Sequence, residues 1–283
     1  MLTDILLIEI ILAFLAGLLI GSFLNVCVFR LPRDLSVVQP RSFCPGCEKT
    51  IAGYDNIPLV SYILLRGRCR HCGDRIPLRY PLVELSTGLA FAICAAAFGG
   101  FTLMAVKFAI FSAILIALIA TDLEERILPD EFTLGGIGLG IVFAAFVPQD
   151  LNGTPGIVHL FLGPYLGPVW CSIGEALLGA AVSSGLIWLM AWLYQRIRHR
   201  EGMGLGDVKM IGMIGAFMGL PAALLTLVLA SLLGAVGGLI FIFATRKKAS
   251  TYELPFGSFL GLAALAMAAY GKLAITWYSH AGT

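Results

Sequence analysis

Two aspartates in unusual settings are the residues of this chain best placed to do chemistry. Asp207 ends the glycine-rich stretch Gly204-Leu205-Gly206-Asp207 at the mouth of an apolar run, and Asp122 follows the apolar run from Phe101 to Thr121. Ionisable groups at membrane depth cost enough free energy to be read as functional. Glycine on both sides of Leu205 would allow a positive φ, or a close approach to a neighbour or an extended peptide.

The two aspartates are expected to work as a pair. Two close carboxylates do not both ionise easily, so one holds a proton while the other activates water, which suits attack on a peptide carbonyl. Each also has a purely structural reading. Asp122 could be a helix-flanking acid in a charged loop, and Asp207 could be the N-cap of a helix starting at Val208.

Four cysteines form a second candidate site. Cys44 and Cys47 make one Cys-x-x-Cys pair, Cys69 and Cys72 make another, and 21 residues separate the pairs. This pattern predicts a tetrahedral four-thiolate zinc site, which is structural because no coordination position stays open. Two disulfides, which a reducing compartment disfavours, or an iron centre with the same ligands are the alternatives.

The elements that position these residues are predicted to be membrane helices. The chain of 283 residues is 59% hydrophobic with a mean hydropathy of +0.92, which excludes an ordinary soluble domain. Eight spans are expected, including two that are short for a bilayer. They are Ile5–Phe29, Pro81–Phe98, Phe101–Thr121, Phe132–Val147, Ser172–Tyr194, Met203–Leu220, Ala222–Ala244 and Pro255–Trp277.

The distribution of basic residues sets the predicted orientation. Residues 30–80 hold 9 of the 19 Lys and Arg residues, which marks a cytoplasmic loop and places the N-terminus outside. The fold is therefore expected to be an all-α polytopic membrane protein with a small cytoplasmic zinc domain after the first helix. The expected division is 1–29 for the first helix, 30–80 for the zinc domain and 81–283 for the catalytic membrane domain.

Other chemistries fit the sequence less well. None of the four histidines falls in an apolar run beside a serine or cysteine, so a nucleophilic triad is not expected. A metal-binding transporter subunit that uses Asp122 and Asp207 as ion or proton carriers is the main alternative function. It would place the acids deep within a span, whereas both fall at span ends. A structural assembly factor for secretion is the third option.

At these residues the chain resembles the type IV prepilin peptidases over nearly its whole length. The resemblance rests on five stretches of sequence. They are Gly21-Ser22-Phe23-Leu24-Asn25-Val26 with Arg30-Leu31-Pro32; the cysteine region continuing to Leu85; Asp122 with Leu128-Pro129-Asp130; the GxGD motif Gly204-Leu205-Gly206-Asp207 with Lys209; and Pro255-Phe256-Gly257. Glu124 stands where many members of the family carry a second aspartate.

The resemblance implies a GxGD-type intramembrane aspartyl protease with Asp122 and Asp207 as its catalytic residues. Such enzymes cut short basic leaders from prepilins or pseudopilins at the cytoplasmic face of the bacterial inner membrane. They commonly also methylate the new N-terminus with S-adenosylmethionine, although no cofactor fingerprint is visible in the sequence. The acids Glu124, Glu125 and Glu131 near the catalytic pair are expected to attract a basic leader.

Overall fold

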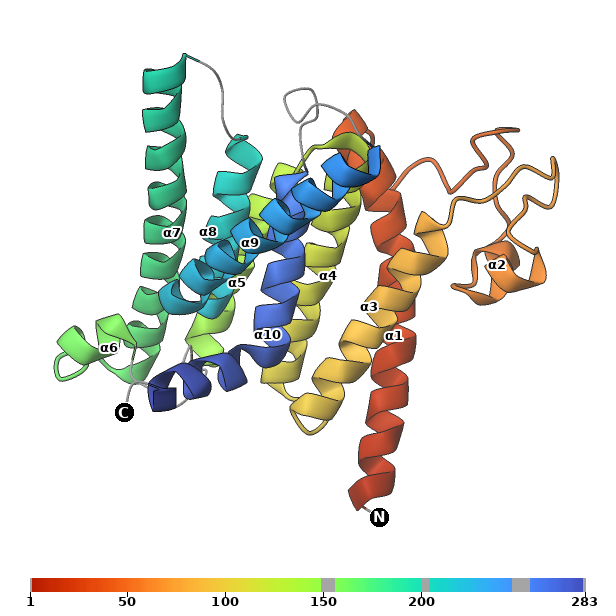
Figure 1. Ribbon diagram of the computed structural model, residues 1–283. Coiled ribbons are helices and arrows are strands. Elements are labelled where there is room, and N and C mark those ends of the chain that lie inside the picture. Colours follow the sequence, from red (N-terminus) through yellow and green to blue (C-terminus); the bar gives the residue numbers. More distant parts are fainter. Residues whose placement is uncertain (1, 149–155, 200–203, 246–254, 282–283) are drawn as a thin grey trace. The chain divides into compact units, whose positions relative to one another are not determined.

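The computed structural model is built from helices and describes residues 2–148, 156–199, 204–245 and 255–281. At residues 2, 241–245 and 270–281 it describes the backbone alone. It divides into two compact units, Met1–Glu125 and Arg126–Thr283. The first contains α1 (Leu2–Arg30), α2 (Val60–Leu64), α3 (Arg79–Ala97), α4 (Leu103–Glu125) and the 3-10 turns η1 (Leu31–Arg33) and η2 (Gly53–Asn56). The second contains α5 (Asp130–Phe146), α6 (Ile157–Leu162), α7 (Pro168–Arg198), α8 (Leu205–Met218), α9 (Leu220–Thr245) and α10 (Phe256–Ala281) (Figure 1).

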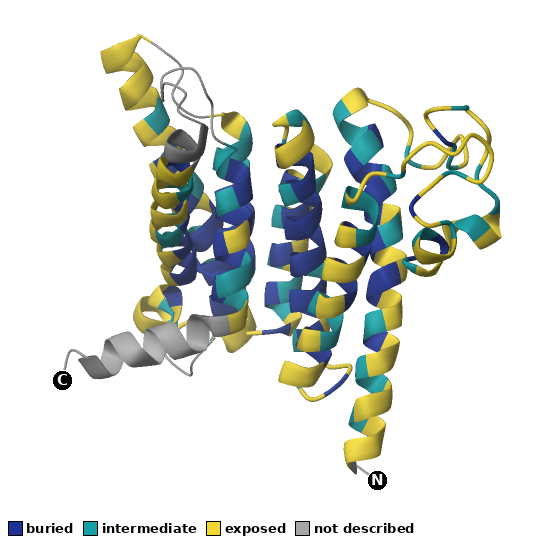
Figure 2. Cartoon of the chain, turned by 45° about the vertical axis from the view of Figure 1, so that its right-hand side comes forward, coloured by how far each residue is buried: buried dark blue, intermediate teal, exposed yellow. Residues whose placement is uncertain are grey.

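The all-α prediction is confirmed for the described residues, where β-structure is limited to two isolated bridges. Helices are the expected outcome for apolar runs in lipid, because each backbone N–H and C=O must find its partner within the segment. In Figure 2 the first half of α1 is coloured mostly as exposed. Its leucines and isoleucines are about half accessible, which is typical of a helix side that faces lipid.

The eight-span prediction is not confirmed. Among the described residues, α1, α3, α4, α7 and α9 are long and apolar enough to cross a membrane, and Phe256–Ala269 forms a shorter apolar helix. The other two predicted spans correspond to α5 and α8, with 17 and 14 residues. At 1.5 Å per residue they reach only about 25 and 21 Å, short of a hydrocarbon core of about 30 Å.

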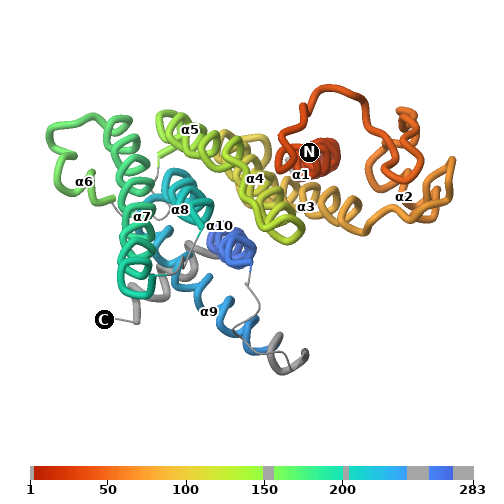
Figure 3. The backbone as a smooth tube through the Cα atoms, turned by 90° about the horizontal axis from the view of Figure 1, so that it is seen from above, coloured from red at the N-terminus to blue at the C-terminus, as the bar shows by residue number. Residues whose placement is uncertain are grey.

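Small residues set the close packing of the first unit. Gly17 and Gly21 lie one turn apart on α1, where α1 runs beside α3 (Figures 1 and 3). A Cβ at Gly17 would lie 2.7 Å from the carbonyl oxygen of Thr87, and one at Gly21 would lie 2.8 Å from the Cα of Glu84. These contacts are shorter than side chains allow, so the two backbones meet only because glycine is present.

Glycines also allow close helix packing around α8 in the second unit. A Cβ at Gly179 of α7 would lie 2.4 Å from the carbonyl oxygen of Gly215 of α8, and one at Gly215 would lie 2.3 Å from that of Gly179. On the side of α5, a Cβ at Gly140 would lie 2.8 Å from Ala216. The short helix α8 is thereby held against both α5 and α7, and its residues from Met210 to Met218 are buried.

The division into units differs from the predicted domain bounds. The predicted membrane domain of residues 81–283 is shared between the units, because α3 and α4 pack with α1. The predicted zinc domain of residues 30–80, which includes the loop between η1 and α3, belongs to the same unit as α1. The sequence pattern places helices along the chain but does not state which helices share contacts, so it could not have placed the boundary after Glu125.

Candidate metal centre and catalytic residues

Each cysteine pair sits in a tight turn of the same design. In the first turn, the backbone N–H of Cys44 donates to the carbonyl of Lys49 at 3.0 Å, and the N–H of Glu48 donates back to Cys44 at 2.7 Å. In the second, Cys69 donates to the carbonyl of Asp74 at 2.8 Å, and Gly73 donates back to Cys69 at 3.0 Å. These hydrogen bonds fold each Cys-x-x-Cys segment so that its two thiols point the same way.

The structure brings all four predicted cysteine ligands together. The sulfur atoms of Cys44, Cys47, Cys69 and Cys72 lie within 4.8 Å of one another. The sulfurs of Cys44 and Cys72, from different turns, are 3.7 Å apart. A tetrahedral zinc site with Zn–S bonds of about 2.3 Å separates its sulfurs by roughly 3.8 Å. The four thiols are therefore spaced to hold a tetrahedral ion, whereas a disulfide would need about 2.05 Å between two of them.

The electrostatics of the turns favour thiolates at part of this site. The backbone N–H groups of Cys72 and His71 point at the thiol of Cys69 and lower its pKa to about 7. The N–H of His71 lies 3.4 Å from that sulfur, while its imidazole is exposed. Burial raises the pKa of the Cys44 thiol instead. A bound cation would offset that penalty, since thiolates rather than thiols coordinate metal.

Two arginine side chains stabilise the conformation of the cysteine loop, one through an ion pair and one through hydrogen bonds to backbone carbonyls. The guanidinium of Arg70 binds the carboxylate of Asp55 in a two-pronged arrangement, with Nη2–Oδ1 and Nε–Oδ2 distances of 2.6 and 2.8 Å. The hydrogen bonds and charge of Arg70 hold the pKa of Asp55 below its usual range. At the start of the loop, the buried guanidinium of Arg30 donates to the carbonyls of Ser36 and Pro40 at 2.8 and 2.6 Å.

Asp122 is buried, with 6% of its surface exposed, and lies near the end of α4. The residue before it, Thr121, turns its hydroxyl back to the carbonyls of Ala117 and Leu118 at 3.1 and 3.0 Å. Thr121 thus satisfies its hydroxyl within its own helix. The structure places a carboxylate, as expected, where a long apolar helix ends.

Asp207 is half-buried and lies in the first turn of α8, which begins at Leu205. The N-cap interpretation of Asp207 is wrong, because Gly204 occupies the N-cap position with φ −71° and ψ 147°. The positive φ that the glycine-rich stretch would allow is also absent at Gly204, whose φ is −71°. Asp207 lies instead beside the backbone N–H groups of the first turn, where the helix dipole favours negative charge.

Gly206 has a packing reason to be glycine. A Cβ at this position would lie 3.0 Å from the Cβ of Leu128, which precedes α5. The close approach that the glycine-rich stretch predicted is therefore present, and the neighbour is Leu128 of the same unit. The start of α8 is fixed against the start of α5 by this contact.

Lys209 supports the same junction. Its Nζ lies 2.6 and 2.9 Å from the two carboxylate oxygens of Asp130, the first residue of α5. The side chains of Lys209 and Asp130 are 32% and 56% exposed, so this ion pair is partly exposed to solvent. This ion pair connects two sequence motifs. One is Leu128-Pro129-Asp130, and the other is the GxGD motif with Lys209.

The acids expected to attract a leader differ in their contacts. Glu124 forms an ion pair with Arg79, and Glu125 forms one with Arg33. Glu131, in the first turn of α5, is exposed. Two of the three acids are thus already compensated by arginines of their own unit, which flank the cysteine loop. Sequence reasoning missed these pairs, since 45 and 92 positions separate the partners.

Asp122 lies in the first unit and Asp207 lies in the second. Within those units the structure does bring together the four cysteines, Lys209 with Asp130, and the two glutamates with their arginines. The pairing of the aspartates remains a prediction from the sequence.

Comparisons with known proteins agree with these features. A family model described as the bacterial peptidase A24 N-terminal domain matches residues 15–98, and one described as the type IV leader peptidase family matches residues 109–239. No solved structure matches the chain. The first match takes in the cysteine loop, and the second takes in Asp122 and Asp207.

Relatives named prepilin leader peptidase/N-methyltransferase cover most of the chain. The Myxococcus xanthus protein is 39% identical over 240 residues, which are 85% of this chain and 65% of that protein. The Aeromonas salmonicida protein is 33% identical over 294 residues, or 94% of this chain and 92% of the relative. The Pseudomonas aeruginosa protein is 33% identical over 286 residues, or 93% and 88%. The chain therefore belongs to the type IV leader peptidase family.

Proposed function

We propose that this chain is an intramembrane aspartyl endopeptidase that removes the short basic leader of type IV prepilins or type II secretion pseudopilins. The observation that carries the proposal is the match to the leader peptidase family over residues 109–239, which contains both Asp122 and Asp207. The local setting of each residue supports it, since Asp122 ends a long buried helix and Asp207 begins a short buried one.

The proposed chemistry needs one ionised and one protonated carboxylate. The ionised group takes a proton from water while the water oxygen attacks the carbonyl carbon of the scissile bond. The protonated group donates its proton to the carbonyl oxygen, and the resulting tetrahedral intermediate collapses as a proton passes to the leaving amine. Two nearby carboxylates divide these roles because the charge on one raises the pKa of the other.

The test of this proposal compares four charge-neutralising variants in a prepilin cleavage assay in detergent. Asp122→Asn and Asp207→Asn should each abolish leader removal, and the double variant should be no worse than either, because the residues act as a unit. Asp34→Asn is the matched control: Asp34 is exposed with φ 54°, a conformation that Asn also tolerates. Substantial cleavage by a folded single variant would remove that residue from the mechanism.

The four cysteines are proposed to hold a structural zinc ion. Four thiolate ligands fill a tetrahedral shell, so the ion would contribute stability to the loop and no open position for water or substrate. The geometry of the thiols supports this choice. Zinc would join the two cysteine turns and so would fix the loop between α1 and α3.

The substrate is proposed to approach from the cytoplasmic side. Residues 30–80 carry 9 of the 19 basic residues, which favours a cytoplasmic loop and an outside N-terminus. Because Glu124 and Glu125 are paired with arginines, Glu131 is the acid of this group best placed to attract a positively charged leader. The scissile bond would lie where the apolar helix of the substrate begins.

A second activity, N-methylation of the new N-terminus, is proposed from the names of the relatives. S-adenosylmethionine supplies the methyl group in such reactions. The family match over residues 15–98 adds a domain to the peptidase part, and this domain holds the cysteine loop. Prepilins and pseudopilins are then both the substrates of cleavage and the acceptors of the methyl group.

A further inference from the structure

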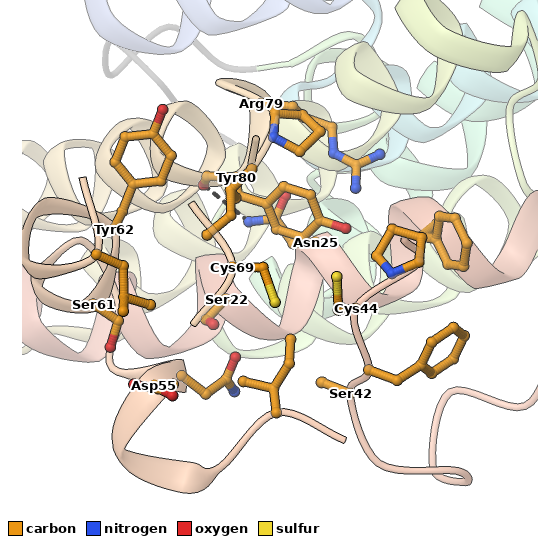
Figure 4. A pocket seen from close by; sticks show the side chains of 18 of the residues that line it. Ser22, Asn25, Ser42, Cys44, Asp55, Ser61, Tyr62, Cys69, Arg79 and Tyr80 are labelled. Atoms are coloured by element: carbon orange, nitrogen blue, oxygen red, sulfur yellow. Dashed lines mark hydrogen bonds between the residues drawn. The ribbon is translucent and has the colours of Figure 1, made fainter. Parts of the chain in front are cut away.

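A cavity of about 530 Å³ lies within the first unit, between the cysteine loop and the adjoining ends of α1 and α3. Figure 4 shows polar and aromatic side chains from these three segments gathered around it, among them Asn25, Tyr62 and Tyr80. Cys44 and Cys69 line it as well, so the predicted metal centre forms part of its wall. The size falls in the range of small-molecule and cofactor sites, about 300 to 1,000 Å³.

One hydrogen-bond acceptor in the wall of this cavity lacks a partner. Asn25 is 2% exposed, and its Nδ2 donates to the carbonyl oxygen of Tyr80 at 3.0 Å. Its Oδ1 is buried without a hydrogen bond in the structure. Because the amide must present its NH₂ group to Tyr80, the free atom has to be the oxygen. Buried polar atoms are nearly always paired, so an orphaned acceptor in a cavity wall points to a ligand that donates to it.

A donor in the same wall is also unpaired. The Nε of Arg79 is buried without a partner, while Nη1 of the same guanidinium pairs with Glu124. Arg79 and Asn25 both line the cavity, so it presents one free donor and one free acceptor. Leaving either group dry and unpaired is unfavourable, and a ligand that donates to Asn25 and accepts from Arg79 would remove that cost.

A strained turn borders the cavity. Leu59 has φ 59° and ψ −45°, and the N–H of Val60 donates to the carbonyl of Pro58 at 2.6 Å, which makes a tight γ-turn. The buried carboxylate of Glu84 on α3 holds this turn by accepting the N–H of Leu59 at 2.8 Å. Strain of this kind persists only where surrounding contacts enforce it, and it is concentrated at ligand sites.

We propose that this cavity binds the sulfonium nucleoside that donates the methyl group, with Asn25 Oδ1 and Arg79 Nε as its hydrogen-bonding atoms. The inference rests on the methyltransferase part of the proposed function. S-adenosylmethionine has amino groups that could donate to Asn25, a carboxylate that could accept from Arg79, and a purine that suits the rings of Tyr62 and Tyr80.

The alternative occupant, an anionic lipid headgroup, fits the unpaired oxygen of Asn25 less well. Of the five arginines that line the cavity, three are paired with acids, because Arg33 pairs with Glu125, Arg70 with Asp55 and Arg79 with Glu124. Arg30 donates to backbone carbonyls, and Arg75 and Lys49 are further cations in the lining. A phosphate would leave the oxygen of Asn25 facing another acceptor. A ligand that carries amino donors, as S-adenosylmethionine does, agrees better with the unpaired oxygen of Asn25.

The test measures S-adenosylmethionine binding to the purified full-length protein in detergent by equilibrium dialysis. Arg79→Lys keeps the positive charge beside Glu124 but removes Nε. Asn25→Leu removes the free oxygen together with the hydrogen bond from Nδ2 to Tyr80. Each should weaken binding about tenfold or more, as expected for the loss of a hydrogen bond to a charged or buried partner. Ser86→Ala on the exposed side of α3, away from the cavity, should bind as the wild type does.

Two further measurements keep the outcome clear. Arg79→Lys should keep cleavage of the leader within about twofold of the wild type, because lysine keeps the positive charge that pairs with Glu124. Asn25→Leu should keep cleavage too but melt a few degrees lower, because the carbonyl of Tyr80 loses its partner. Ultraviolet cross-linking of labelled S-adenosylmethionine should modify peptides from residues 22–29, 59–65 or 79–84. Cross-links confined to residues 126–283, or variants that bind the cofactor normally, would overturn the proposal and leave the methyltransferase activity standing.

The remaining outcomes separate this proposal from the function beneath it. A wild-type protein that cuts prepilin but neither binds S-adenosylmethionine nor methylates would refute the methyltransferase activity itself. Stabilisation of the wild type by phosphatidylglycerol that is lost in both variants, with cofactor binding intact, would assign the cavity to a lipid headgroup and refute the proposal. Variants that lose cleavage and stability together would show that Asn25 and Arg79 serve the fold.

Discussion

The contact between α7 and α8 predicts a large effect from the smallest possible substitution, Gly215→Ala. The new methyl group would lie 2.3 Å from the carbonyl oxygen of Gly179 and 2.8 Å from the hydroxyl of Ser183. The first of these is about 1 Å short of ordinary van der Waals contact. Because the clashing atom is backbone, no side chain can rotate away, and the helices must separate.

Two losses and one gain make up the expected change in the free energy of unfolding. Overpacking of this kind costs roughly 1 to 3 kcal/mol. Separation also stretches the hydrogen bond from Ser183 to the carbonyl of Ile211, now 3.1 Å long, with a further loss of about 1 kcal/mol. Alanine returns about 1 kcal/mol through its higher helix propensity. The net destabilisation is therefore about 1 to 3 kcal/mol, or roughly 2 to 10 °C in melting temperature for a unit of this size.

The matched control is Gly185→Ala, two turns beyond Gly179 on α7. A Cβ at Gly185 has no atom within 4 Å, so this variant gains helix propensity without a clash. Its melting temperature in detergent should equal or exceed that of the wild type. If Gly215→Ala melts no lower than Gly185→Ala, the close approach of α7 and α8 is refuted. Cleavage should fall with Gly215→Ala, since α8 carries Asp207 in its first turn.

Three other variants test separate parts of the site. Cys44→Ser should remove about one zinc ion per chain and make residues 30–80 sensitive to protease. Cys171 is buried outside the cysteine cluster, so Cys171→Ser should keep the metal. An unchanged zinc content in Cys44→Ser would contradict the four-thiolate site. Glu131→Gln should slow cleavage of a Lys/Arg-rich leader at low salt and spare a neutral leader, and equal slowing of both would refute charge reading. Lys209→Gln should lower the free energy of unfolding by less than about 1 kcal/mol, because its ion pair is partly exposed. A larger loss measured by chemical denaturation would count against that assessment.

The features that sequence predicted well are those with a local cause. Long apolar runs become helices because lipid leaves the backbone no other partner, and the spacing of the cysteines brings the thiols together once each pair forms a tight turn. The single cysteines Cys27, Cys94 and Cys171 are buried, as expected of small apolar residues. The all-α fold and the clustering of the four cysteines could therefore be predicted from the sequence alone.

The features that sequence missed depend on contacts between distant residues. The N-cap of α8 was misplaced because Gly204 takes an extended conformation and lets the helix begin before Asp207. The cavity was missed although a signal was present. Asn25 and Glu84 are polar residues inside predicted spans, and such residues are read as functional. Their shared site becomes visible only when α1 and α3 are placed side by side.

The ion pairs of the first unit connect the metal centre to a proposed catalytic residue. Glu124 and Glu125 follow Asp122 on the last turn of α4, and their partners Arg79 and Arg33 lie where the cysteine loop joins α3 and α1. Each pair is partly exposed and contributes about 1 kcal/mol or less, so neither fixes the helix end alone. Together they make the position of Asp122 depend on the folding of the loop. Loss of the metal should then slow cleavage without removing any residue that touches the substrate, and restoring the metal to the same sample should restore the rate.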